Sequence, residues 1–82
     1  MTDLSAEELV ELDDLQAAYK ATLEEWIAAI RTEEALVSVS PHSVAEVDQW
    51  EKAHFDEDAA RNKVRAAKEA YENALRQKFF GF

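Results

Sequence analysis

Apolar residues recur along most of the chain at steps of three, four or seven, the spacing of one face of an α-helix. In the first half this stripe comprises Leu12, Leu15, Tyr19, Leu23, Trp26, Ile30 and Val37. In the second half it comprises Val47, Trp50, His54, Ala60, Val64, Ala67, Tyr71, Leu75 and Phe79. The one proline, Pro41, separates the stripes, and the one glycine, Gly81, is the penultimate residue. This pattern predicts an all-α protein of two long helices.

Capping signals predict where the two helices begin and end. Ser5 and Glu8 have the spacing of a capping box, and Ser43 and Glu46 repeat it. Gly81 is a natural C-terminal stop, because glycine accepts a positive φ. The predicted elements of this single domain, residues 1–82, are a helix at about 5–37, a turn at 38–43 and a helix at about 43–80.

The second helix contains one ambiguous segment around Asp56. An aspartate is a good N-cap, so Asp56 could begin a new helix within the predicted one. Two alternatives therefore stay open for the second arm: a continuous helix, or a helix that is kinked or split near Asp56.

A chain that folds back at Pro41 forms an antiparallel hairpin, in which residue i lies near residue 82 minus i. Trp26 is then expected opposite Phe55. Charge supports this arrangement, because residues 1–25 contain eight acids and one lysine, whereas residues 59–82 contain six bases and two acids. The hairpin places these opposite charges side by side, which favours the antiparallel over the parallel alternative.

The apolar stripes are broader than a single facing helix can cover. Eighty-two residues are close to the lower limit for an independent core, and the chain contains no cysteine that could form a disulfide. We therefore expect a homodimer that closes into a four-helix bundle, or docking on another protein, and the sequence does not separate the two. The predicted interface residues are Leu12, Tyr19, Trp26, Ile30, Trp50, Phe55, Val64 and Tyr71 at the seam, with Phe80 and Phe82 as outer contacts.

The charge and composition exclude several classes of protein. A net charge of -9, from 18 acidic and 9 basic residues, disfavours direct binding to nucleic acid. A hydrophobic fraction of 48% argues against disorder. No stretch approaches the roughly 20 apolar residues of a membrane span, and the first residues lack the basic start and apolar run of a secretory signal. We therefore expect a cytoplasmic location and no membrane contact.

Little in the sequence is typical of an enzyme or of a cofactor site. The serines cluster at the caps and the turn, and His42 and His54 are the only histidines. One glycine cannot form a glycine-rich phosphate loop. We therefore predict no catalytic activity and no cofactor.

One motif offers an alternative function in metal binding. Glu51 and His54 form a Glu-x-x-His pair on one helix face, and this pair resembles the motif of two-helix ferritin-like proteins. A dimer of hairpins would supply such motifs from two helices, and Glu33 or Glu34 on the first helix lies within about one turn of the level of Glu51. Glu34 is also in register with Ile27, Ile30 and Val37, which favours an inward orientation. The resemblance implies a metal site at Glu34, Glu51 and His54.

The predicted function is a small, acidic, non-enzymatic interaction module that acts as an adaptor, regulator or inhibitor and associates with itself or with another protein. The first alternative is the ferritin-like metal-binding oligomer. The second is a mimic of nucleic acid, in which rows of carboxylates imitate phosphates. The acidic residues considered for this mimicry are Asp3, Glu7, Glu8, Glu11, Asp13, Asp14, Glu46, Asp48, Asp56, Glu57 and Asp58.

Overall fold

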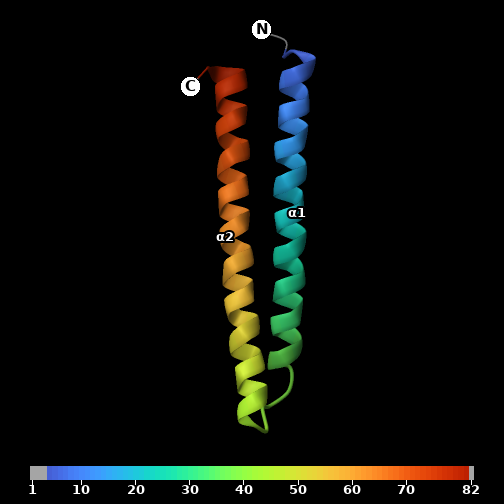
Figure 1. Cartoon of the computed structure of the whole chain (residues 1–82), viewed down its shortest axis with the longest axis vertical. Helices are drawn as coiled ribbons and strands as arrows, with labels where there is room; N and C mark the ends of the chain where they lie inside the picture. Colours follow the sequence, from blue (N-terminus) through green and yellow to red (C-terminus); the bar gives the residue numbers. More distant parts are fainter. Residues whose placement is uncertain (1–3, 82) are drawn as a thin grey trace.

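The computed structural model describes residues 4–81, which form two helices, α1 (Ala6–Val37) and α2 (Val44–Phe80). The helices lie side by side and antiparallel, so that the start of α1 and the end of α2 are at the same end of the molecule (Figure 1). The resulting rod measures 62 × 19 × 15 Å. The predicted helical hairpin is confirmed, and α2 passes through Asp56 as one continuous helix.

Hydrogen bonds at both helix starts follow the capping signals of the sequence. The Ser5 hydroxyl accepts the N–H of Glu8 at 3.2 Å, and the Glu8 carboxylate accepts the N–H of Ser5 at 3.3 Å, so this capping box is complete. At α2 the Ser43 hydroxyl accepts the N–H of Glu46 at 3.3 Å. The Glu46 carboxylate instead accepts the N–H of His42, at 2.6 Å, and so ties the turn to the helix start.

The end of α2 is set by Gly81. Its φ of 77° lies in the left-handed region, where residues with a Cβ are strained. The N–H of Gly81 donates to the carbonyl oxygen of Gln77 at 3.1 Å, which satisfies one of the last carbonyls of the helix. The predicted C-terminal stop is confirmed.

The N-cap of α2 gives a first testable prediction. We expect Ser43→Ala to lower the free energy of unfolding by about 1 kcal/mol, because the amide of Glu46 loses its hydroxyl acceptor. Thermal unfolding followed by circular dichroism measures this change. Ser40→Ala is the matched control, since the exposed Ser40 lies in the same turn but caps neither helix. Equal losses in the two variants would contradict the assignment of Ser43 as the cap.

The two helices meet along a seam with a seven-residue repeat, in steps of four and three. The seam residues of α1 are Glu8, Leu12, Leu15, Tyr19, Thr22, Trp26, Ala29, Glu33 and Leu36, and all are buried or half-buried. Those of α2 are Ala53, Glu57, Ala60, Val64, Ala67, Tyr71, Ala74 and Lys78, and they are likewise buried or half-buried. This repeat is the pattern of a coiled coil. Large side chains of α1 thus pack against a side of α2 that consists half of alanine.

The register of the hairpin differs from the predicted one. Four contacts across the seam join Glu11 to Lys78, Tyr19 to Tyr71, Glu25 to Lys63 and Glu33 to His54. The residue numbers in these pairs add up to 89, 90, 88 and 87 instead of the predicted 82. Relative to the predicted register, α2 is therefore displaced along α1 by about six residues. The residue numbers of a fifth contact, Trp26 to Glu57, add up to 83, because two long side chains bridge residues that are not level with each other. The first turns of α2 consequently project beyond the end of α1 (Figure 1).

This displacement explains which predicted seam residues are covered. Leu12 and Val64 are buried, and Tyr19, Trp26 and Tyr71 are half-buried. Ile30, Trp50 and Phe55 are more exposed, at 39%, 37% and 67%. In the observed register Ala53 and Ala60 lie nearly level with Leu36 and Trp26, which pairs large residues with small ones.

Candidate functional site

The hairpin has two flanks, one on each side of the seam, and they differ in chemistry. In an antiparallel coiled coil, residues one position after the seam residues of either helix lie on the same flank. On this flank the large apolar residues are Leu9, Leu23, Ile27, Ile30 and Val37 of α1, with Leu75 and Phe79 of α2. Val47 joins them when the repeat of α2 is continued back to Glu46. We call this surface the apolar flank.

The opposite flank consists of the residues one position before each seam residue. Among the described residues these are alanines and polar or charged side chains, and every one is exposed. Lys63 and Glu25 form an ion pair across it, with Nζ and Oε2 3.7 Å apart. The two flanks therefore differ in character, since one is polar and the other presents large apolar side chains.

Side chains on the apolar flank are poorly covered by the hairpin itself. Val37 is 60% exposed, Phe79 is 55% exposed and Leu9 is 48% exposed. Ile27, Ile30 and Val47 are also exposed. A row of exposed large hydrophobic residues on one side of a folded protein marks a binding surface more often than a solvated one.

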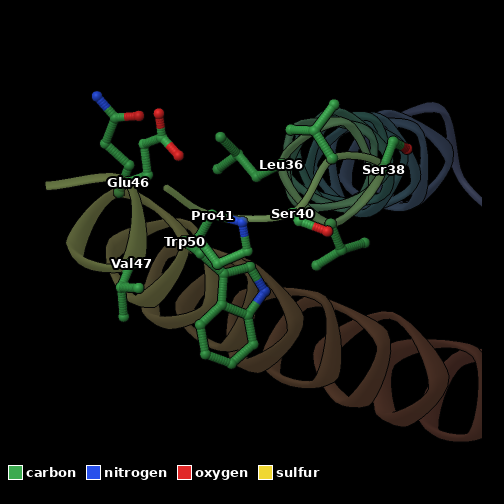
Figure 2. A pocket seen from close by; sticks show the side chains of 10 residues that line it. Leu36, Ser38, Ser40, Pro41, Glu46, Val47 and Trp50 are labelled. Atoms are coloured by element: carbon green, nitrogen blue, oxygen red, sulfur yellow. The ribbon is translucent and has the colours of Figure 1, made fainter. Parts of the chain in front are cut away.

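A hollow of about 620 Å³ lies at the turn end of the molecule. It is lined by the end of α1, the turn and the projecting first turns of α2, including Leu36, Val37, Val39, Pro41, Val47 and Trp50 (Figure 2). Two of these residues, Val37 and Val47, also belong to the apolar flank. The hollow therefore continues the apolar flank to the end of the rod.

A polar cluster crosses the seam about midway between Trp26 and the turn. The indole Nε1 of Trp26 donates a hydrogen bond to Oε1 of Glu57 at 2.6 Å. His54 lies between two carboxylates, with Nδ1 3.3 Å from Oε1 of Glu33 and Nε2 3.7 Å from Oδ2 of Asp58. One ligand atom each from Glu33, His54 and Glu57 lie within 4.8 Å of one another.

The cluster differs in membership from the metal site that the ferritin-like resemblance implies. His54 belongs to it, with a side chain 45% exposed, but Glu34 and Glu51 are exposed and lie outside it. The reason is the position of each residue in the repeat. Glu33 and Glu57 are seam residues and lie close to His54 from both helices. Glu34 points away from the seam, and Glu51 lies before Ala53, the first seam residue of α2.

Many of the acids considered as phosphate mimics have partners within the chain. The shortest ion pairs join Glu11 to Lys78, Asp58 to Arg61 and Asp56 to Lys52, at 2.5, 2.8 and 3.2 Å. Glu8 and Glu46 accept backbone N–H groups at the caps. Of the remaining expected site residues, Phe80 is 70% exposed, whereas Phe82 and Asp3 lie outside the described residues.

The described residues thus offer two candidate sites, the apolar flank with its hollow and the polar cluster. In the described part of the chain, neither helix combines the length and the apolar character that crossing a membrane requires. Comparisons of the chain with protein-family models, with curated proteins and with solved structures give no match, so the interpretation of these surfaces rests on their geometry.

Proposed function

We propose that the protein is a non-enzymatic interaction module that binds a second copy of itself through the apolar flank. The two hairpins would then form a four-helix bundle, with the apolar flanks facing each other. The observation that carries this proposal is the concentration of exposed Leu, Ile, Val and Phe side chains on one flank and their absence, among the described residues, from the other.

The size of the exposed surface supports a partner of this kind. A compact protein of 9.3 kDa exposes about 5,000 Å², whereas this hairpin exposes 6341 Å². Its radius of gyration is 18.3 Å, compared with about 12 Å for a compact domain of this length. The excess exceeds the roughly 800 Å² that each partner buries in a typical stable interface. The hairpin therefore exposes enough surface to supply an interface of that size.

The mass of the protein in solution tests this proposal directly. Multi-angle light scattering over a range of concentrations should give twice the chain mass of 9.3 kDa, with dissociation only on dilution. A chain mass that stays at one copy at every concentration would refute self-association. The apolar flank would then be assigned to a different protein, which is the other partner considered from the sequence.

Metal binding is a second candidate function, because Glu33, His54 and Glu57 place three ligand atoms within 4.8 Å. Imidazole and carboxylate ligands suit Zn²⁺ and Fe²⁺. Asp58 beside the second imidazole nitrogen resembles the carboxylates that orient metal-bound histidines. The existing contacts to Trp26 and Asp58 also provide a purely structural role for the cluster, in which it joins α1 to α2.

Titration with Zn²⁺ and with Fe²⁺ separates these two roles of the cluster. If the cluster binds metal, we expect stoichiometric uptake that His54→Ala abolishes and His42→Ala leaves intact. His42 is the matched control, since it is exposed in the turn, away from the cluster. No uptake at micromolar metal would reject metal binding and leave the structural role.

A further inference from the structure

The apolar flank of α1 contains a row of residues at steps of seven, Leu9, Gln16, Leu23, Ile30 and Val37. Seven residues are nearly two helical turns, so these side chains lie in line along about 42 Å of the helix. The row has the same number of residues on each side of Leu23. A two-fold axis through Leu23 therefore brings Leu9 of one copy to Val37 of the other, as a self-complementary interface requires.

The same flank of α2 is apolar at its ends and charged in its middle. The charged residues there are Asp58, Arg61, Arg65, Lys68 and Glu72. If two hairpins were packed in parallel on their apolar flanks, α1 of one copy would lie on α2 of the other. At the observed register, Leu23 would lie level with Arg65, and Ile27 would lie level with Arg61. Covering charged groups with apolar side chains is costly, so the parallel arrangement is unfavourable.

An antiparallel arrangement instead places α1 on α1 and α2 on α2. The apolar row of α1 then packs on its own copy. Within α2, residues 44–58 contain six acids and one lysine, and residues 59–80 contain six bases and two acids. With the axis at Leu23 and the observed register, Arg65 of α2 lies at the axis, so residues 50–58 of one copy, with a charge of -3, lie along residues 72–80 of the other, with a charge of +1. Opposite charges thus meet at both ends of the α2 pair, whereas the basic residues of 59–71 lie along the same segment of the other copy.

From these observations we infer that the two copies pack antiparallel, with α1 against α1 across a two-fold axis at Leu23. This inference rests on the proposed function, because it requires a dimer through the apolar flank. It also assigns an occupant to the hollow at the turn end. The end of one hairpin that carries Leu9 and Phe79 lies at the turn end of the other, where Val37, Val47 and Trp50 line the hollow.

Cross-linking through introduced cysteines tests the position of the axis, and the cysteine-free chain gives no background. A disulfide requires Cα atoms within about 7 Å. We expect Leu23→Cys to form a disulfide-linked dimer under mild oxidation, because the two copies of residue 23 meet at the axis. Ala21→Cys is the matched control. Ala21 lies two residues away on the opposite, exposed flank, and should remain reduced.

Spin labels on Ser40→Cys test the orientation independently of Leu23. Ser40 lies exposed in the turn, so the two labels lie at opposite ends of an antiparallel bundle. Their separation should approach the 62 Å length of the hairpin. In a parallel bundle both turns lie at one end, and the separation should be comparable with the 19 Å width.

The outcomes distinguish the inference from the function on which it rests. A dimeric mass, a cross-link at residue 23 and distant labels support the antiparallel pair. A dimeric mass with close labels, or with a cross-link at residue 21 instead of 23, overturns the inferred arrangement and leaves self-association standing. A mass of one chain overturns both, and a mass that grows without limit overturns the closed two-fold pair.

Discussion

Replacing Trp26 with alanine is expected to lower the free energy of unfolding by about 3 to 5 kcal/mol. Trp26 is the largest side chain of the seam, and its indole N–H also binds Glu57 on the opposite helix at 2.6 Å. The substitution leaves a gap opposite the alanines of α2, which have no bulk to fill it, and it removes the hydrogen-bond donor of Glu57. A loss of this size is a large part of the total stability of a small domain.

Thermal unfolding at fixed chain concentration measures this effect, since the proposed dimer would make the midpoint depend on concentration. For a domain of this size, 3 kcal/mol corresponds to a fall in the midpoint of about 12 °C or more. Trp26→Phe retains most of the side-chain volume but removes the N–H. The lost hydrogen bond should lower the free energy of unfolding by about 1 kcal/mol, in addition to the loss caused by the smaller ring. An unchanged midpoint in Trp26→Ala would contradict the assignment of Trp26 to the seam.

Phe55→Ala is the control that separates the observed register from the one predicted by sequence. If Trp26 packed on Phe55, the two alanine variants would lose similar stability. In the observed register Phe55 is 67% exposed, and substitutions at such positions change stability by about 0.5 kcal/mol or less. A loss in Phe55→Ala comparable with that in Trp26→Ala would restore the predicted register.

The helices and their ends could be predicted because their causes are local. Ser5, Ser43 and Gly81 act on backbone groups within four residues of themselves. Proline has a similarly local effect on the residue before it. Such signals can be recognised in a short window of sequence, and the boundaries predicted from them lie within one residue of the observed helix ends.

The seam and the register could not be predicted in the same way, because they depend on how two helices fit together. The predicted stripe followed the largest apolar residues and therefore included Ile30 and Val37. The structure covers Ala29 and Leu36 instead and leaves the other two exposed on the apolar flank. On α2 the seam consists half of alanines, which a search for large apolar residues passes over.

Polar seam residues were missed for a related reason. Glu33, Glu57 and Lys78 occupy seam positions, and their charged ends contact His54, Trp26 and Glu11 respectively. A carboxylate at a covered position is unfavourable unless it has a partner, and the sequence alone does not identify that partner. A search for apolar periodicity therefore rejects such a residue. The seven-residue spacing from Ala53 to Lys78 contains the missing signal, and it becomes visible when alanine and polar residues are allowed in the repeat.

The separation of large residues into a covered seam and an exposed flank also bears on function. An isolated hairpin would be more soluble with Ile27, Ile30 and Val37 replaced by polar residues, as on the opposite flank. Their apolar character contributes little to the seam, since the hairpin leaves them exposed. These apolar side chains would instead stabilise a second interface on that flank, such as the one in the proposed four-helix bundle.

Ile30→Glu is expected to dissociate the proposed dimer. Covering an isoleucine contributes about 1.5 to 3 kcal/mol, and a two-fold interface contains the substitution twice. The combined loss of about 3 to 6 kcal/mol raises the Kd by a factor of about 10² to 10⁴. Light scattering on a dilution series would measure the shift, and circular dichroism should show that the helices persist.

Ala28→Glu is the matched control, because it introduces the same charge two residues away on the opposite, exposed flank. Both variants place the new carboxylate within one turn of existing glutamates, so their general electrostatic effects are similar. If Ala28→Glu also dissociates the dimer, repulsion between highly acidic chains is responsible and the apolar flank loses its assignment. If neither variant changes the Kd, the two copies meet elsewhere. Dissociation by Ile30→Glu alone is the result that places the interface on the apolar flank.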